Sequence, residues 1–299
     1  MTASKESNGM GKQAENREHG ASGHTLSAAT RLLEPFAAEK AIDLTAFMGQ
    51  WPARLSVRAS ADDLSAMADR LGLGALCVSH IASIFGFDTR EGNEELFRET
   101  AGDSRLWPFA IVNPDEAGWE QELEWAAGAG ARGIRIVPGY HRYSLASPQA
   151  LDLVKRLESY RLPLHICLRL EDERLVHPRL PVSQIPPHEV AELLRQAGSL
   201  PIVLSGLRAH EWAGIAEHLN DDERAQREKL VLLDLWFANG PIGVIASLCL
   251  NGSSSRLGYG SCAPIQVPEA TALQLAAADI TPEHRTALCR GNASTLLGL

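Results

Sequence analysis

From residue 41 onward the chain repeats one pattern: a short apolar run, a turn, and a stretch with apolar residues three and four positions apart. The apolar runs predict buried strands, and the stretches with helical spacing predict amphipathic helices. Eight strands are predicted, at residues 41–47, 75–81, 107–113, 133–138, 163–170, 201–207, 229–236 and 257–262. The clearest helices are predicted at residues 62–71, 120–129, 148–160, 188–197 and 212–219, with Ser60 and Ser147 as N-caps of the first and third.

Eight alternations of strand and helix within roughly 250 residues are typical of a single (β/α)₈ TIM barrel with parallel strands buried on both faces. A doubly wound open sheet is the alternative. That fold carries a Gly-rich phosphate turn after its first strand, and this chain has Thr45-Ala46-Phe47-Met48-Gly49 there. The pattern therefore favours the barrel.

Three predicted strand-to-helix connections are long, at residues 82–92, 139–147 and 171–187. In a barrel these lie on the face formed by the carboxyl ends of the strands, where active sites are found. The third is rich in proline and is interpreted either as a stiffened lid or as an ordinary surface excursion.

The composition of the chain argues against some classes of binding partner and indicates a cellular setting. The net charge of −9 argues against a nucleic-acid or anionic-membrane surface, because both need clustered Lys and Arg. The five Cys show no CxxC spacing, and Cys77, Cys167 and Cys249 lie in apolar runs, which indicates a reducing, cytoplasmic setting. Residues 1–30 are polar, lack the apolar core of a secretory signal, and are expected to form a disordered tail before a domain at 31–299. No run is long enough to span a membrane.

Residues 256–264 read RLGYGSCAP, and residues 281–299 end in a predicted short helix, a Gly-Asn pair and a closing apolar turn. Both segments resemble the amidohydrolase superfamily, specifically its amidohydrolase-related (amidohydrolase 2) branch, over residues 41–299. Members of that branch usually read Gly-Ser-Asp-x-Pro in the final barrel strand, with the Asp as metal ligand and proton acceptor. This chain has Cys262 in place of that Asp.

The resemblance implies a metal held at the carboxyl ends of several strands, yet the implied positions have changed. Thr45 and Phe47 stand where two His are usual, Cys167 replaces the His of strand five, and Ser205-Gly206 replaces the Ser-His of strand six. His165, which lies one layer deeper in the barrel than Cys167, is the one imidazole that remains as a possible metal ligand. A catalytic zinc site needs about three converging ligands. The sequence therefore predicts a protein without a metal or other cofactor.

Three residues are candidates for catalysis. Asp234 lies inside an apolar strand, so it is either ion-paired or a general base with a raised pKa. His165 could move a proton. Cys262 is interpreted as an inert buried thiol or, alternatively, as a thiolate nucleophile with His165 or His141 as its base.

Other polar and aromatic residues are candidates for binding a substrate. Arg135 lies inside a buried strand, so it either pairs with Asp234 or Asp43 or faces an anionic ligand. Arg169 could clamp a carboxylate or join the ion pairs of the neighbouring residues 171–174. The remaining candidates at the barrel mouth are Tyr140, His141, Trp51 and His80, of which His141 is alternatively a loop residue and Trp51 a core residue.

Two functional hypotheses follow. In the first, the chain is a metal-independent hydrolase, lactonase or decarboxylase for a small cyclic or carboxylated substrate. In the second, it is a catalytically inactive pseudo-amidohydrolase that binds a metabolite or a protein partner, with a homo-oligomer compatible with either. An enzyme should show ionisable groups with shifted pKa values around a deep pocket. A binding protein should have that cavity plugged by Phe47, Trp51 and their neighbours.

Overall fold

The computed structural model describes residues 31–180, 182–208, 210–238 and 243–298. The predicted tail at residues 1–30 lies outside these ranges, and its disorder stays a prediction. Within the described residues, the helices are all too short or too polar to cross a bilayer.

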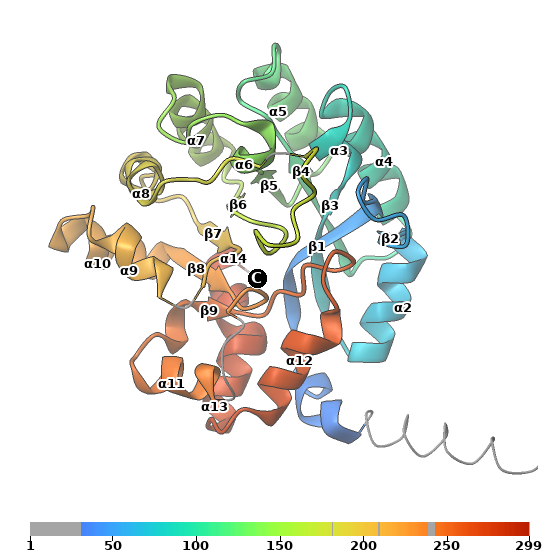
Figure 1. The fold of residues 1–299 in the computed structure, drawn as a ribbon, viewed down its shortest axis with the longest axis vertical. Coiled ribbons are helices and arrows are strands. Elements are labelled where there is room, and N and C mark those ends of the chain that lie inside the picture. Colours follow the sequence, from blue (N-terminus) through green and yellow to red (C-terminus); the bar gives the residue numbers. More distant parts are fainter. Residues whose placement is uncertain (1–30, 181, 209, 239–242, 299) are drawn as a thin grey trace, which may run out of the picture.

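The described elements build on one curled, nine-stranded sheet (Figure 1). Its order is β2-β1-β3-β4-β5-β6-β7-β8-β9, and every neighbouring pair is parallel except the antiparallel pair β2–β1. The eight predicted strands are confirmed; the short β2 was not predicted. The strands are β1 (Ile42–Gln50), β2 (Arg58–Ala59), β3 (Ala75–His80), β4 (Leu106–Ile111), β5 (Gly133–Ile136), β6 (Leu164–Cys167), β7 (Ile202–Ser205), β8 (Val231–Asp234) and β9 (Leu257–Gly258).

The segment that follows β9 runs beside β1, although these two ends of the sheet are more than 200 residues apart in the chain. Backbone N–H groups of Leu44 and Phe47 donate to Tyr259 and Ala263 at 3.0 and 2.7 Å, and that of Cys262 donates to Thr45 at 2.7 Å. A parallel bridge also pairs Ala46 with Ala263. The two ends of the sheet therefore share main-chain hydrogen bonds.

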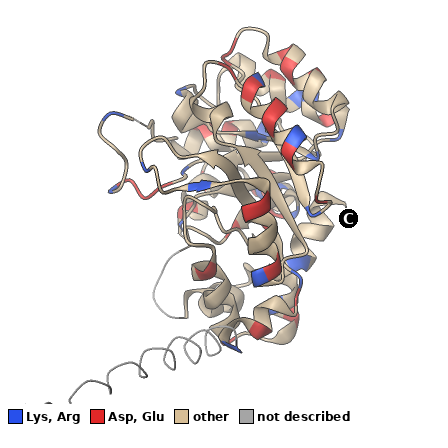
Figure 2. Ribbon diagram, turned by 90° about the vertical axis from the view of Figure 1, so that its right-hand side faces the viewer, with Lys and Arg blue, Asp and Glu red and all other residues tan. Residues whose placement is uncertain are grey.

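Helices surround the sheet on the outside (Figure 1), and charged residues are spread over these helices and the loops (Figure 2). The five predicted helices are confirmed as α2, α5, α7, α8 and α9. Residues 82–92, predicted as a loop, instead contain α3 and the start of α4. The helices are α2 (Ala61–Leu71), α3 (Ala82–Phe85), α4 (Arg90–Thr100), α5 (Trp119–Gly128), α6 (Pro138–His141), α7 (Pro148–Tyr160), α8 (Pro187–Gln196), α9 (Glu211–Ala216), α10 (Asp221–Leu230), α11 (Val244–Leu250), α12 (Pro268–Ala277), α13 (Pro282–Thr286) and α14 (Asn292–Leu297).

Helix starts follow the predicted capping chemistry. The Ser60 hydroxyl accepts from the N–H of Asp63, and the Asp63 carboxylate accepts from the Ser60 N–H, which makes a reciprocal capping box. The Ser147 hydroxyl accepts from the N–H of Ala150 ahead of α7. Both predicted N-caps are therefore confirmed.

The predicted break at Gly291-Asn292 is wrong. A π-helical turn, η2 (Ala287–Gly291), leads directly into α14, so the chain stays helical through the pair. The Asn292 amide donates to the carbonyls of Ser254 and Leu257 at 2.7 and 2.8 Å. This Asn therefore ties the last helix to the start of β9 instead of ending a helix.

Candidate functional site

The carboxyl ends of the strands converge on a buried apolar cluster, which we call the strand-end cluster. Phe47 and Trp51 are completely buried in it, and so are the thiols of Cys167 and Cys262. All five cysteines are free and buried, as predicted for Cys77, Cys167 and Cys249. The cluster consists of Phe47, Trp51, Ile81, Ile84, Ile111, Val137, Cys167, Leu170, Trp236, Phe237, Cys262 and Ile265.

A chain of buried polar side chains lies directly beneath this cluster. Thr45 Oγ1 and Ser205 Oγ both donate to Oδ2 of Asp234, the latter at 2.6 Å. Thr45 Oγ1 also lies 3.3 Å from Nε2 of His165. Ser205 in turn accepts from the indole N–H of Trp236, a member of the strand-end cluster, at 2.9 Å. Side chains from β1, β6, β7 and β8 are thus joined inside the curl of the sheet.

Arg135 on β5 is completely buried, and its donors go to carbonyls and to an imidazole. It donates to the carbonyls of Ala46, Leu44 and Cys77 at 2.9, 3.1 and 2.9 Å, and to Nδ1 of His165 at 3.1 Å. β1 pairs with β3 in an irregular register between Asp43 and Ala46, the stretch that contains the Leu44 carbonyl. In the described residues these contacts replace the expected salt bridge to Asp234 or Asp43.

Two aromatic rings hold the Arg135 guanidinium from either side. It lies 4.6 Å from the ring centre of Phe47, in the strand-end cluster, and 5.9 Å from that of Phe109, which belongs to a second apolar cluster nearer the amino ends of the strands. The cation–π contacts and the carbonyls compensate its desolvation. The interior therefore has three layers: the apolar strand-end cluster, the buried polar side chains, and the second apolar cluster.

The buried acids have shifted pKa values with a common cause. Burial raises the pKa of the Asp234 carboxyl to about 7, against the opposing effect of hydrogen bonds from Ser205 and Thr45. Burial likewise raises the pKa of Asp43 to about 6, and the Ser261 hydroxyl and N–H, which donate to Asp43 at 2.6 and 2.9 Å, limit the rise. Both groups therefore titrate near neutral pH.

Burial, with the charge of Arg135, lowers the pKa of His165 well below its usual value, so the imidazole is neutral. Burial raises the pKa of Cys167 to about 12 and that of Cys262 well above its usual value. The Cys262 thiol donates to the carbonyl of Leu170 at 3.7 Å. A thiolate at Cys262 is therefore strongly disfavoured in this arrangement.

The remaining predicted binding residues lie around the edge of the strand-end cluster. Trp51 and Tyr140 pack edge to face with Phe85, with ring centres 5.1 and 5.7 Å from it. His141 points its Nε2 at the Ser83 carbonyl, 3.2 Å away, and burial lowers its pKa to about 4. His80 accepts from the N–H of Ala82 through Nδ1 at 3.1 Å. The structure thus gives these residues local packing and backbone contacts and does not gather them around one open space.

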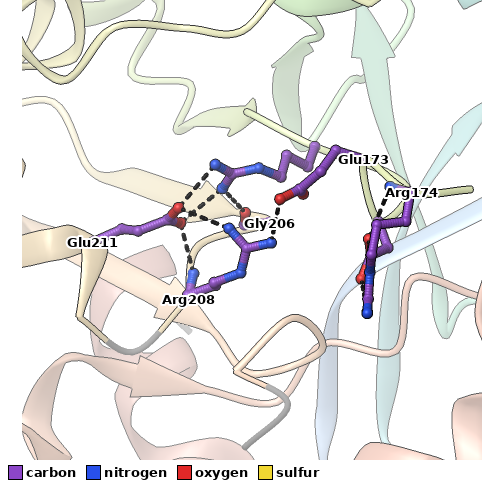
Figure 3. Close-up of polar contacts among 7 residues, drawn as sticks. Glu173, Arg174, Gly206, Arg208 and Glu211 are labelled. Carbon is purple, nitrogen blue, oxygen red and sulfur yellow. Dashed lines mark hydrogen bonds and ion pairs between the residues drawn. The ribbon is translucent and has the colours of Figure 1, made fainter. Parts of the chain in front are cut away.

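Arg169 follows β6 and is paired with a residue 42 positions away. Its Nη1 and Nη2 donate to the two carboxylate oxygens of Glu211 at 2.7 and 2.8 Å. Arg208 also binds Glu211, through its backbone N–H at 2.8 Å, and its Nη2 reaches Glu173 at 2.5 Å (Figure 3). This network connects the 171–187 segment to the start of α9.

The principal cleft lies to one side of the buried polar chain. It has a volume of about 820 Å³ and lies between the 171–187 segment and helices α8 and α9. Tyr140 and Arg169 are the predicted site residues on its wall. In Figure 1 the segment between β6 and α8 lies in front of the strands, inside the ring of helices. Among the cleft-lining residues none belongs to the strand-end cluster or to the polar chain.

A comparison with models of protein families shows which family the chain belongs to. The amidohydrolase family model Amidohydro_2 matches residues 34–299. The chain belongs to the amidohydrolase family. This confirms the resemblance that the terminal strand and the C-terminal segment indicated. Among curated proteins, none matches the chain.

Solved structures of similar fold include two decarboxylases and a probable hydrolase. A 2,6-dihydroxybenzoate decarboxylase from Rhizobium has a TM-score of 0.62 and 16% identity, with 86% of this chain and 98% of that chain covered. A dihydroxybenzoic acid decarboxylase from Polaromonas sp. JS666, with bound manganese and 2-nitroresorcinol, has a TM-score of 0.62 and 16% identity. The match covers 87% of this chain and 97% of that chain. A probable 2-pyrone-4,6-dicarboxylic acid hydrolase from Acinetobacter baumannii, with citric acid bound, has a TM-score of 0.60 and 15% identity. The match covers 87% of this chain and 100% of that chain. At these identities the likeness shows the fold.

The side chains of this member of the amidohydrolase family do not fit the metal that the family implies. Phe47 has no ligand atom, the Cys262 thiol donates to the Leu170 carbonyl, and Ser205 is engaged with Asp234 and Trp236. In the part of the chain that the structure describes, no group of three or more His, Cys, Asp or Glu could hold a metal ion. A catalytic metal site needs about three converging ligands, and these residues do not supply them.

Sequence reasoning missed three partners: Ser205 and Thr45, which bind Asp234, and Glu211, which pairs with Arg169 on the cleft wall. Thr45 and Ser205 were considered only as poor replacements for metal ligands. Their signal is nonetheless present in the sequence, because a hydroxyl in each of two buried strands needs a partner, and Asp234 is a buried acceptor.

Proposed function

We propose that this amidohydrolase-family protein binds a small organic molecule and has lost the hydrolytic site of the family. One observation supports this most directly: the strand-end cluster fills the place where a substrate would reach Asp234 and His165. A reacting group must come within hydrogen-bond distance of the base, and the Phe47 and Trp51 side chains occupy that approach. We also infer that the sheet is a complete (β/α)₈ barrel, since β1 and the segment after β9 share hydrogen bonds.

The test combines an assay with mass spectrometry. The purified chain is incubated with 2,6-dihydroxybenzoate or 2-pyrone-4,6-dicarboxylate, with and without added Mn²⁺ or Zn²⁺, and native mass spectrometry looks for a bound small molecule. We expect no turnover above the rate without protein, and a bound or exchangeable ligand. Turnover that Asp234→Asn abolishes would overturn the proposal.

A second candidate function is metal-independent proton transfer, favoured specifically by the pKa of about 7 at Asp234. In that case Asp234 is the base, Thr45 and the neutral His165 behind it orient its carboxylate, and Cys262 is the further catalytic candidate. The binding candidates are Arg135, Arg169, Tyr140, His141, Trp51 and His80. This function requires the strand-end cluster to open, so Phe47→Ala should raise turnover. If the chain is a binding protein without catalysis, Phe47→Ala should stay inactive.

A further inference from the structure

The cleft beside α9 has the size and surface of a ligand site. Its volume of about 820 Å³ lies within the range of about 300–1,000 Å³ that is usual for such sites. Leu168, Val190, Leu207 and Ile215 form apolar walls. Because the cleft lies apart from the strand-end cluster, a ligand can enter it without displacing Phe47 or Trp51.

The charged groups of the cleft are mostly paired with one another. Arg169, on the wall, is held by Glu211, which Arg208 also contacts. Glu173 pairs with Arg208. Glu171, the other acid of the segment, pairs with Arg54 from the β1–β2 connection. These contacts neutralise three carboxylates with three guanidinium groups.

One carboxylate of the cleft wall is left over. Glu217, at the end of α9, is exposed and has no ion pair among the described residues. The other three wall carboxylates, at 171, 173 and 211, each pair with an arginine, and Arg169 is the one of those arginines that lines the cleft. An anionic ligand would meet the charge of Glu217 without a free cation to pair with.

We infer that the cleft binds a largely apolar small molecule with a single cationic group, and that Glu211 excludes carboxylates by occupying Arg169 and Arg208. This inference rests on the binding function proposed above. Glu211 holds the position between two guanidinium groups that a ligand carboxylate would otherwise take, since both oxygens of Glu211 accept from Arg169. The ligand's ammonium group would lie near Glu217, with its apolar body against the walls.

The experiment uses three probes that share a naphthalene body: 2-naphthylmethylamine, 2-naphthamide and 2-naphthoate. Their affinities for the full chain are measured at pH 8 by saturation-transfer NMR titration. A cleft-blocking variant is Gly214→Leu, because a Cβ added at Gly214 on the cleft wall meets nothing within 4 Å. Its matched control is Gly128→Leu, at the exposed end of α5, where an added Cβ also meets open space.

We expect the amine to bind the wild type at least tenfold more tightly than the carboxylate, with the amide between them. Gly214→Leu should weaken amine binding at least tenfold, and Gly128→Leu should leave it unchanged. Glu217→Gln should remove most of the preference for the amine. Glu211→Gln should strengthen naphthoate binding at least tenfold, because Arg169 and Arg208 would lose their internal anion.

The inference is overturned if naphthoate binds the wild type as tightly as the amine, if no probe binds, or if Gly214→Leu binds the amine normally. These outcomes leave the proposed function standing when native mass spectrometry still finds a bound small molecule. Conversely, amine binding at the cleft together with Asp234-dependent turnover would overturn the proposed function and leave the cleft assignment intact.

Discussion

Arg135 donates from both Nε and Nη2 to Nδ1 of His165, at 3.2 and 3.1 Å. A guanidinium can only donate, so Nδ1 is the acceptor and the imidazole proton resides on Nε2. That Nε2–H is directed to Thr45 Oγ1, whose own hydroxyl proton is then available to Asp234. One directional chain of hydrogen bonds therefore runs from a buried cation to a buried acid.

Removing His165 should destabilise the protein strongly. His165→Ala leaves Arg135 without one acceptor and opens a cavity in a fully buried layer. We expect a loss of about 3 kcal/mol in the free energy of unfolding, measured by urea titration with circular dichroism. His188→Ala, an exposed residue on α8, is the control and should change it by less than about 0.5 kcal/mol. A loss below about 1 kcal/mol for His165→Ala would contradict the described network.

Asp234 should make stability fall as pH rises through the weakly acidic range. Its folded-state pKa, about 7, lies above the usual value of 3.8, so the folded state binds more protons than the unfolded state between these values. Its contribution is therefore full below about pH 4 and is lost by about pH 7, at up to about 1.4 kcal/mol per pH unit.

Asp234→Asn removes this titration. The stability of the wild type relative to the variant should therefore decline from pH 5 to pH 7.5 and then level off, as measured by urea unfolding across that range. Asp279→Asn, an exposed acid, is the matched control. A relative stability that rises with pH would mean that Asp234 is ionised in the folded protein at pH 5.

The strands could be predicted from the sequence because each is a short apolar run, and eight such runs alternate with amphipathic stretches. The helix α3 and the start of α4 could not, because residues 82–92 mix Gly, Phe and charged residues without a clear period. The partners of Arg135 were also beyond sequence reasoning, since no spacing reveals that carbonyls of β1 and β3 lie within reach of its side chain. Arg169 has three acids within four residues, yet it pairs with Glu211, which only the folded chain brings near.

The five thiols should be unreactive in the native protein. All are buried, and burial raises the pKa of Cys77, Cys167 and Cys289 to about 12. Because the thiolate is the nucleophile, we expect no thiol to react with Ellman's reagent within minutes at pH 8, and all five to react in 8 M urea. Rapid reaction of one native thiol, abolished by Cys262→Ala, would instead support the nucleophile interpretation.

Restoring the family's aspartate should not restore a metal site. Cys262 is fully buried, and its sulfur faces the Leu170 carbonyl, so a carboxylate placed there would meet an acceptor inside the strand-end cluster. The backbone at Cys262 has φ of 53°, a region that Asp tolerates better than most residues, so strain would not be the cause of a loss. Burial would raise the pKa of the new carboxyl, and stability would therefore be lost as pH rises.

We expect Cys262→Asp to lose about 2–3 kcal/mol at pH 8 and less at pH 5, measured by urea unfolding. Cys262→Ala, the control, should lose about 1 kcal/mol at both pH values, because it removes only packing. Added Mn²⁺ or Zn²⁺ should leave the melting temperature of Cys262→Asp unchanged, since Phe47 and Cys167 supply no further oxygen or imidazole ligand. A rise of several degrees with metal would show that the strand ends can still assemble a cation site, and the conclusion that these residues do not fit a metal would then be wrong.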